Sequence, residues 1–442
     1  MAQEPQNRAV EQCRPARAHA LSQECNAAAI DPAVLRCTMA AVSKPTPQPV
    51  PLLDFSRQFA PLRQEILDAI ARVCDSQQFI LGPQVAAFEA AAATDCASRF
   101  AIGCASGSDA LWLALAAADI GDSSAATRHT GKPVGIITTP FSFFATASAI
   151  LRAGARPVFA DIDLRTFNLS PESVAEILNG PAGKNVKAIL PVHLFGQCAD
   201  WDGFAALQRD HPGLLLIEDG AQAFGAAWTT TGQPARTAGS LGDASAFSFY
   251  PTKNLAAFGD AGLVTTSSAE IDRRVRSLRA HGMTRRYFHD EVGWNSRLDE
   301  MQAAILNVKL RHVAEWNQQR RDRAARYNQL FREAGLVGGS ISEGVVLPFT
   351  DPRATPVFHQ YVIRAPLRDA LRAHLTAQQI GSEIYYPVPI HLQAALRDLG
   401  HKPGDFPHAE RAAAEVLALP LYPQLRDDEQ QTVVEAIRAF YA

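Results

Sequence analysis

The chain has 442 residues, of which 47% are apolar and 20% are charged, so it is long enough for two or three domains and can bury a sizeable core. Its 42 Lys and Arg nearly balance its 45 Asp and Glu, and the net charge of −3 argues against bulk binding to nucleic acid or to an anionic membrane. No apolar run approaches the ~18 residues that a transmembrane helix needs, so we expect no membrane span.

Cysteine usage excludes further classes. The seven cysteines are odd in number, widely scattered and contain no CxxC pair. Neither a disulfide framework nor a zinc site is indicated, and we expect no metal site. The N-terminus lacks the basic segment and the apolar stretch of a secretory signal, so a reducing, cytoplasmic location fits best.

The first 48 residues differ in composition from the rest of the chain. They are rich in Ala, Gln, Pro, Arg and Ser, show no sustained apolar period and end in a Pro-rich stretch. Such a composition does not bury enough apolar surface to offset the cost of ordering the chain. We expect residues 1–48 to form a disordered tail on which the function does not depend.

Residues 49–310 alternate between strand and helix patterns. Short apolar stretches predict strands at Phe100–Cys104, Val134–Thr138, Pro157–Ala160, Val186–Val192, Leu214–Ile217 and Ala246–Phe249. Helix-like segments occur at Leu62–Cys74, Gln84–Thr94, Asp109–Ala118, Pro171–Leu178 and Trp201–Gln208. This alternation predicts a large α/β domain whose mostly parallel sheet is covered by helices on both faces. In such sheets ligands bind outside the carboxyl ends of the strands, so the residues there are the candidate site residues.

A long helical stretch follows, from Leu298 to Ala334. Its predicted apolar face consists of Ile305, Val308, Trp316, Tyr327 and Phe331. The same stretch carries several arginines, which favour a solvated helix face over the alternative of a nucleic-acid surface. These arginines are Arg311, Arg320, Arg321, Arg323 and Arg326.

Residues 311–442 are expected to form a smaller C-terminal α+β domain. Beyond the long helical stretch, its patterned segments are Val357–Arg364, Leu367–Gln379, Ser382–Tyr386 and a final helix at Asp428–Ala439. The chain shows no internal repeat.

The first informative strand end is Ser106–Leu111, directly after the strand Phe100–Cys104. Its small residues let backbone N–H groups approach an anion, and the next helix presents its positive end there. The segment is therefore a candidate phosphate cup. The alternative is an ordinary turn with a helix N-cap.

The second strand end is Glu218–Gln222, after the strand Leu214–Ile217. An acid at this edge of a sheet can serve a ligand, or it can cap a following helix. The residues alone leave both interpretations open.

The third strand end is Phe247–Asn254, in which Lys253 lies among aromatic and Pro residues. Desolvation there would lower the pKa of the lysine and expose a free amine for Schiff-base chemistry. The alternative is an ordinary surface charge.

The fourth strand end is Thr139–Phe144, with three phenylalanines after the strand Val134–Thr138. One ring could stack on a flat ligand, while we expect at least two of the three to pack in the core. Together the four segments offer a phosphate cup, an aromatic surface, a carboxylate and a lysine, which are what pyridoxal phosphate needs.

On these residues the sequence resembles the DegT/DnrJ/EryC1/StrS aminotransferases, fold-type-I pyridoxal-phosphate enzymes that aminate keto sugars carried on nucleotides. The resemblance runs from about Leu53 to Tyr422. The matching motifs are Phe79–Pro83, Pro191–Gln197, Glu218–Gln222, Ser248–Asn254, Asn295–Asp299, Tyr385–His391 and Leu419–Pro423.

The resemblance implies a role for each of several residues. Lys253 would bind the cofactor aldehyde and Asp219 would pair with the pyridine nitrogen. The other implied cofactor contacts are Gly107, Ser108 and Ser248 to the phosphate, Gln222 near the 3′-oxygen and Phe143 on the ring. Asn295 would reach the phosphate of the cofactor in the other subunit, which implies a homodimer with shared active sites. His193, Tyr386 and His391 would lie near the substrate.

One departure from the family pattern concerns the segment Gly121–Pro133. A polar loop stands there where the family usually has a short turn. If this loop lies near the mouth of the site, it affects which acceptor is bound.

The implied function is transfer of an amino group from an amino acid such as glutamate to a keto group of a nucleotide-linked sugar, with pyridoxamine phosphate as the intermediate form of the cofactor. One alternative is a non-catalytic or regulatory protein of the same fold. A second is a pyridoxamine-phosphate-dependent sugar dehydratase, which Lys253 disfavours because those enzymes have histidine there. A nicotinamide-dependent oxidoreductase is disfavoured because no GxGxxG follows the first strand.

Overall fold

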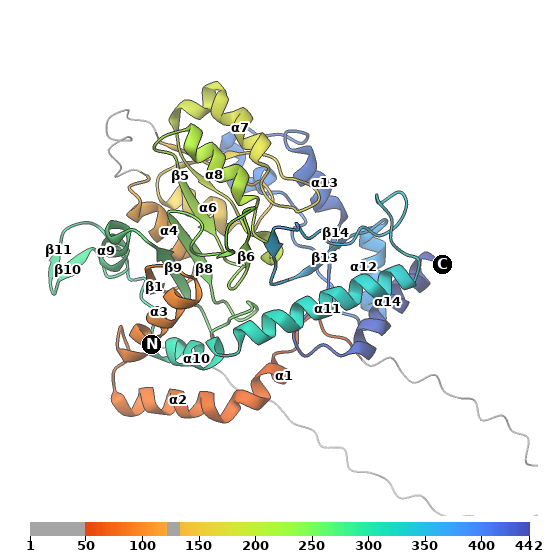
Figure 1. The fold of residues 1–442 in the computed structure, drawn as a ribbon, viewed down its shortest axis with the longest axis horizontal. Coiled ribbons are helices and arrows are strands. Elements are labelled where there is room, and N and C mark those ends of the chain that lie inside the picture. The colour runs from red at the N-terminus through yellow and green to blue at the C-terminus, as the bar shows by residue number, and fades with distance from the viewer. Residues whose placement is uncertain (1–48, 122–132) are drawn as a thin grey trace, which may run out of the picture. The chain divides into compact units, whose positions relative to one another are not determined.

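The computed structural model describes residues 49–121 and 133–442 (Figure 1). The predicted tail, residues 1–48, lies outside the described residues, as does nearly all of the polar loop at Gly121–Pro133. None of the helices in the described ranges is both long enough and apolar enough to cross a membrane.

A seven-stranded sheet forms the centre of the large α/β part. Its spatial order is β1-β9-β8-β5-β4-β2-β3. Six of the strands run in one direction, and β9 is antiparallel to both of its neighbours. The strands are β1 (Phe100–Cys104), β2 (Gly135–Thr138), β3 (Arg156–Phe159), β4 (Val186–Leu190), β5 (Leu215–Asp219), β8 (Ala244–Ser248) and β9 (Gly262–Thr266). The predicted mostly parallel sheet is confirmed, although the sequence analysis missed β9.

Helices cover both faces of this sheet (Figure 1). Alternate side chains of one strand enter different cores: Leu216 of β5 packs with α3, α8 and α10, whereas Ile217 packs with α4, α6 and α9. The bounds of these helices are α3 (Pro83–Asp95), α4 (Gly107–Ala117), α6 (Ala145–Arg152), α8 (Trp201–Asp210), α9 (Ala269–Leu278) and α10 (Glu300–Leu310). The remaining helices of this part are α1 (Phe55–Phe59), α2 (Arg63–Ser76) and α7 (Pro171–Asn179).

The long helical stretch is two helices, α10 and α11 (Val313–Glu333), separated at Arg311 and His312. The predicted apolar face is confirmed, because all five of its side chains are buried.

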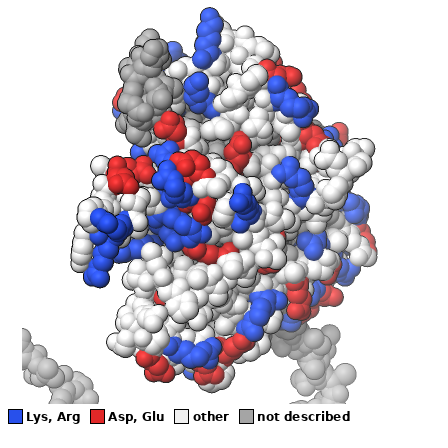
Figure 2. Space-filling view, turned by 60° about the vertical axis from the view of Figure 1, so that its left-hand side comes forward, with Lys and Arg blue, Asp and Glu red and all other residues white. Residues whose placement is uncertain are grey.

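The expectation of a solvated arginine face is wrong for Arg320. Its guanidinium is buried and donates hydrogen bonds to the carbonyl oxygens of Phe358, His359 and Leu421. Arg311 and Arg323 instead form ion pairs with acids of the same chain. On the face shown in Figure 2, Lys and Arg are likewise interspersed with Asp and Glu.

The C-terminal part contains an antiparallel pair of strands and three helices. They are β13 (Tyr361–Arg364), β14 (Val416–Leu419), α12 (Arg368–Ala377), α13 (Pro407–Glu415) and α14 (Asp427–Tyr441). The final helix was predicted within two residues, whereas β14 was missed and residues 382–386 form no regular strand. The predicted domain boundary at residues 310 and 311 falls between α10 and α11 and stays a prediction.

Two small sheets complete the described fold. One consists of β6 (Ala227–Trp228), β7 (Arg236–Thr237) and β12 (Ala354–Thr355). The other is a hairpin of β10 (Met283–Arg285) and β11 (Phe288–His289), which extends beside α9 in Figure 1.

Candidate active site

A cavity of about 750 Å³ opens at the carboxyl ends of β1, β2, β5 and β8, where the sequence analysis expected a ligand. All four strand-end segments contribute to its lining. From these segments the lining residues include Ser106, Gly107, Ser108, Ser142, Phe143, Asp219, Gln222, Ser248 and Lys253. The volume lies in the range of pockets that hold a cofactor or small ligand.

The proposed phosphate cup is the N-terminus of α4. The Ser106 hydroxyl accepts a hydrogen bond from Asp109 N at 3.1 Å, so the N-cap interpretation is correct. Gly107 is required there because a Cβ would lie 2.5 Å from the Cβ of Ser248. The N–H groups of Gly107 and Ser108, in the first turn, have no carbonyl partner within the helix, which is a geometry that favours an anion. The cap and the anion cup are therefore compatible.

The carboxylate of Asp219 is buried at the end of β5. No helix follows this strand, so the helix-cap alternative is wrong. Thr146 Oγ1 donates to Oδ2 at 2.8 Å, and Ala221 N donates to Oδ1 at 3.2 Å. Burial raises the pKa of Asp219, and these two hydrogen bonds and the charge of Lys253 offset only part of that rise.

Lys253 is half-buried on the wall of the same cavity. Burial lowers the pKa of its amine to about 8, against the opposing effect of the Asp219 carboxylate. The surface-charge alternative is therefore wrong. At neutral pH an appreciable fraction of this amine is unprotonated and able to react with a carbonyl group.

The three phenylalanines after β2 divide as expected. Phe141 is fully buried and Phe144 is half-buried against the core. Phe143, by contrast, has 60% of its surface exposed and lines the cavity. Its ring centroid lies 6.2 Å from that of Tyr386, so the two rings form an aromatic lip.

Gln222 is held in one orientation inside the cavity. Its Oε1 accepts a hydrogen bond from Phe195 N at 2.9 Å, and its Nε2 donates to the Tyr386 hydroxyl at 3.2 Å. Tyr386 also lines the cavity, and burial raises the pKa of its hydroxyl, which therefore remains protonated.

Two histidines that the sequence analysis expected near the substrate do not line the cavity. His193 is fully buried beside β5: its Nε2 lies 3.0 Å from Glu218 Oε2, and its Nδ1 accepts from Ala199 N. His391 is also buried, with its Nε2 3.2 Å from Glu410 Oε1. Neither lines the cavity, because each ring is held by partners in the protein interior.

Asn295 is exposed and does not line the cavity of its own chain. It lies beside the hairpin of β10 and β11, opposite Ala280 in an antiparallel bridge. A role in the site of this chain is therefore excluded by its position, whereas a role in a second copy is compatible with its exposure.

The sequence analysis missed several residues of the cavity, of which Thr146 and His359 are the most informative. Asn254 donates both amide hydrogens, to Asn317 and to the Val357 carbonyl, so its Oδ1 faces His359 Nδ1 at 3.2 Å. His359 is then protonated on Nδ1, and burial lowers its pKa far enough to keep the ring neutral. Thr146 lies within α6, and His359 lies two residues before β13. No local sequence pattern sets either residue apart from its neighbours.

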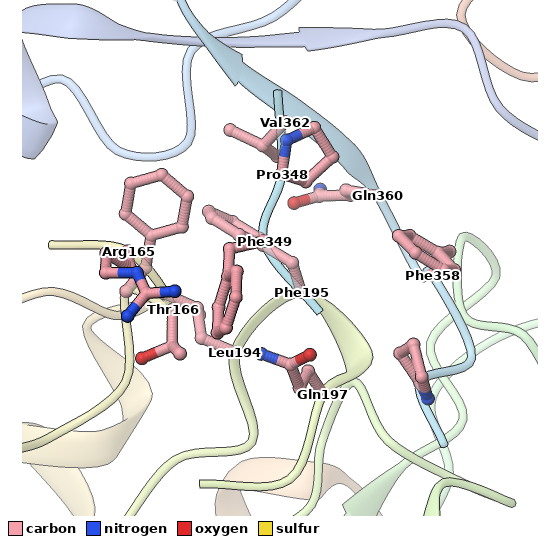
Figure 3. A pocket seen from close by; sticks show the side chains of 12 residues that line it. Arg165, Thr166, Leu194, Phe195, Gln197, Pro348, Phe349, Phe358, Gln360 and Val362 are labelled. Atoms are coloured by element: carbon pink, nitrogen blue, oxygen red, sulfur yellow. The ribbon is translucent and has the colours of Figure 1, made fainter. Parts of the chain in front are cut away.

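A much smaller cavity, of about 30 Å³, lies nearby (Figure 3). It is lined mainly by apolar side chains, and the Arg165 guanidinium stacks 3.9 Å from the Phe349 ring centroid. Its volume is near that of one water molecule. The larger cavity is therefore the candidate active site.

The groups in the larger cavity fit pyridoxal phosphate. An amine with a lowered pKa suits the aldehyde, a buried carboxylate suits the pyridine nitrogen, and the N-terminus of α4 suits the phosphate. Gly107 lets this N-terminus pack directly against Ser248, because a Cβ there would lie 2.5 Å from the Ser248 Cβ.

Comparison with known proteins gives a consistent result. The model of the DegT/DnrJ/EryC1/StrS aminotransferase family matches residues 61–438. A pleiotropic regulatory protein of Geobacillus stearothermophilus is 45% identical, over 89% of this chain and 98% of that protein. A UDP-N-acetyl-3-dehydro-alpha-D-glucosamine 3-aminotransferase of Acidithiobacillus ferrooxidans is 41% identical, over 88% of this chain and 97% of that protein. A dTDP-3-amino-3,4,6-trideoxy-alpha-D-glucose transaminase of Streptomyces venezuelae is 39% identical, over 88% of this chain and 95% of that protein.

Solved structures agree with these relatives. The crystal structure of DesV from S. venezuelae superposes with a TM-score of 0.80 at 39% identity, covering 89% of this chain and 98% of that chain. The structure of NtdA from Bacillus subtilis, with bound pyridoxamine phosphate, gives a TM-score of 0.76 at 27% identity over 88% of this chain and 84% of that chain. The predicted fold class, a fold-type-I aminotransferase, is confirmed.

Proposed function

The chain belongs to the DegT/DnrJ/EryC1/StrS aminotransferase family, and from that membership we propose that it transfers an amino group from glutamate to the C3 keto group of a nucleotide-linked sugar. It is a pyridoxal-phosphate-dependent aminotransferase. The observation that carries the proposal is that Lys253, Asp219 and the N-terminus of α4 border one cavity.

Each side chain has a proposed task toward the cofactor. Lys253 holds the aldehyde, and Asp219 keeps the pyridine nitrogen protonated because its negative charge favours the cationic form. Gly107, Ser108 and Ser248 would hold the phosphate, Gln222 would contact the 3′-oxygen and Phe143 would cover the ring. The cofactor, when bound, supplies an electron sink for the carbon from which a proton is removed.

Lys253 is also the proposed proton carrier. With its amine free, Lys253 would take the proton from Cα of the amino donor. A pKa of about 8 places this amine near the operating pH, where general bases are most effective. The donor leaves as a keto acid before the sugar binds, so ping-pong kinetics are expected.

The names of two relatives support amination at C3. The Acidithiobacillus protein is named as a 3-aminotransferase of a UDP-linked 3-dehydro sugar, and the Streptomyces protein as a transaminase of a dTDP-linked 3-amino sugar. Identities of 41% and 39% over most of both chains support the same acceptor class here. Tyr386, at the lip of the cavity, is the proposed substrate contact among the residues described.

We propose that the working enzyme is a homodimer with shared sites. The described lining of the cavity contains one cation, Lys253, against Asp219, Asp260 and Glu383, although a nucleotide diphosphate brings negative charge. Tyr287, at the turn between β10 and β11, and Val292, in the segment that leads to Asn295, are 77% and 88% exposed, which favours a covering partner surface. A second copy placed there would bring Asn295 to the neighbouring cofactor phosphate.

We also propose that the enzyme works in the cytoplasm. The four cysteines in the part of the chain that the structure describes are all free thiols, as a reducing compartment favours. Three of them are buried, and burial raises the pKa of each of these thiols.

A single-turnover measurement tests the function. Glutamate added to the protein with bound cofactor should remove the visible absorbance band and yield 2-oxoglutarate, and a UDP- or dTDP-linked 3-keto sugar should then restore the band. Lys253→Ala should lose both the band and turnover while the fold is retained. Lys309→Met is the matched control, because burial also lowers the pKa of Lys309 to about 8 but this lysine does not line the cavity.

The second candidate is a regulatory protein of the same fold, which the 45% identity to a pleiotropic regulatory protein favours. Under this alternative the band would persist with glutamate and other amino donors. Restoration of the band by 4-keto sugars and not by 3-keto sugars would leave the aminotransferase in place but overturn the assignment to C3.

A further inference from the structure

Two hydroxyl groups and the Asp219 carboxylate form a buried chain of hydrogen bonds. Ser142 Oγ lies 3.1 Å from Thr146 Oγ1, which lies 2.8 Å from Asp219 Oδ2. All three residues are buried and border the cavity. Ser142 precedes α6, Thr146 lies in its first turn, and Asp219 ends β5, so the chain joins segments that are 73 residues apart.

The direction of these hydrogen bonds follows from the chemistry of the groups. An ionised carboxylate only accepts, so the Thr146 hydroxyl donates to Asp219. The Thr146 oxygen is then free to accept, and the Ser142 hydroxyl is the donor that faces it. Each hydroxyl is thus oriented by the next group along the chain.

The Thr146 hydroxyl has no other evident task. A threonine in the first turn of a helix often forms a hydrogen bond to a backbone group, but within residues 49–121 and 133–442 this hydroxyl forms hydrogen bonds only with Ser142 and Asp219. The N-cap of α6 is Phe144, which makes no side-chain cap. The hydroxyl of Ser148, two residues further along α6, instead donates to the carbonyl of Ala145.

We propose that Thr146 is a positioning residue for the aminotransferase reaction, which holds Asp219 charged and in one orientation toward the pyridine nitrogen of the cofactor, and that Ser142 orients its hydroxyl. This inference rests on the proposed function. The physical reason is that the buried Asp219 carboxylate has only two hydrogen-bond donors among the residues that the structure describes, and Thr146 provides the shorter of the two bonds.

The effect on the cofactor has a definite sign. Without the Thr146 hydroxyl, the pKa of Asp219 would rise. The carboxylate would then compete with the pyridine nitrogen of the bound cofactor for the proton between them. The cofactor ring would then carry less positive charge, and the pKa of the Lys253 nitrogen that holds the cofactor would rise. The pH midpoint of the visible absorbance change is therefore expected to rise.

The experiment compares Thr146→Val, which removes the hydroxyl at nearly constant shape, with Thr146→Ser, which retains it. Absorbance of the bound cofactor is titrated with pH and cofactor dissociation is measured separately. We expect Thr146→Val to raise the midpoint by about one pH unit and to weaken cofactor binding about tenfold, as for one hydrogen bond to a charged group. Thr146→Ser should restore both values, and Ser148→Ala should change neither.

A smaller change of the same sign is expected for Ser142→Ala, which keeps Thr146 and tests the chain if Thr146→Val fails to fold. A midpoint in Thr146→Val or Ser142→Ala equal to that of the unaltered protein would overturn the inference. So would a Thr146→Ser variant that behaves like Thr146→Val, because the effect would then be one of packing. If the unaltered protein shows no visible band with the cofactor, the proposed function itself is wrong.

Discussion

Two neighbouring carboxylates of strand β5 lie on opposite sides of the sheet and have different hydrogen-bond environments. Glu218 and Asp219 are adjacent and both buried, but successive side chains of a strand point to opposite faces. On the closed side, Glu218 accepts hydrogen bonds from the backbone N–H groups of residues 239, 241 and 242, and from Ser245 and His193. On the open side, Asp219 has two donors and a cavity in front of it.

The electrostatic consequences differ accordingly. Burial alone would raise the pKa of Glu218, but His193, Ser245 and the backbone donors outweigh it, and the pKa is lowered. At Asp219 burial dominates, and the pKa is raised. Glu218, which is structural, has its acceptor oxygens satisfied by donors of the protein, whereas Asp219 keeps acceptor capacity for a ligand in the cavity.

Removing the charge on the open side is expected to have the largest effect. Asp219→Asn keeps the shape of the side chain but removes the negative charge that holds the pyridine nitrogen protonated. We expect kcat to fall by about 10³-fold with the free energy of unfolding within about 1 kcal/mol of the original. Steady-state kinetics and urea unfolding measure the two quantities, and near-normal turnover would contradict the role of Asp219.

The corresponding change on the closed side should have the opposite profile. Glu218→Gln leaves backbone N–H groups facing an amide that has one acceptor oxygen in place of two. We expect the free energy of unfolding to fall by about 3 kcal/mol, because a buried charge network is broken. The molecules of this variant that are folded should have a kcat within a few-fold of that of the original enzyme. If activity falls as far as in Asp219→Asn without loss of stability, the distinction between the two sides is wrong.

The pH dependence of cofactor uptake sharpens the description of the open side. Only the unprotonated amine of Lys253 reacts with the aldehyde, and its pKa is lowered from the ordinary 10.5 to about 8. The uptake rate should rise with pH and level off above about pH 8. Stopped-flow absorbance measures it, and a rise that continues to pH 10.5 would indicate an ordinary lysine.

The smallest expected effect concerns the proposed contribution of a second copy to the open side. Asn295→Ala should weaken cofactor binding about tenfold, because one hydrogen bond to a charged phosphate is lost. Asn179→Ala, an exposed asparagine at the end of α7, is the control. Equal cofactor affinity in the two variants would count against a shared site.

The sequence by itself determined the strand ends that carry the chemistry. All six parallel strands and most of the helices between them were predicted, because apolar strands and amphipathic helices are local patterns. Once the strands are parallel, their carboxyl ends meet at one edge, which brings Gly107, Phe143, Asp219 and Lys253 to one cavity. The family motifs made the same residues recognisable.

The tertiary structure alone decided which polar groups those residues meet. The antiparallel strand β9, the burial of Arg320 and the pairing of His193 with Glu218 all depend on segments far apart in the sequence. Thr146 reaches Asp219 across 73 residues and carries no local signal of its own. Periodicity records which side of an element is apolar, but it does not record which distant donor lies opposite a given acceptor, and that choice requires the packed chain.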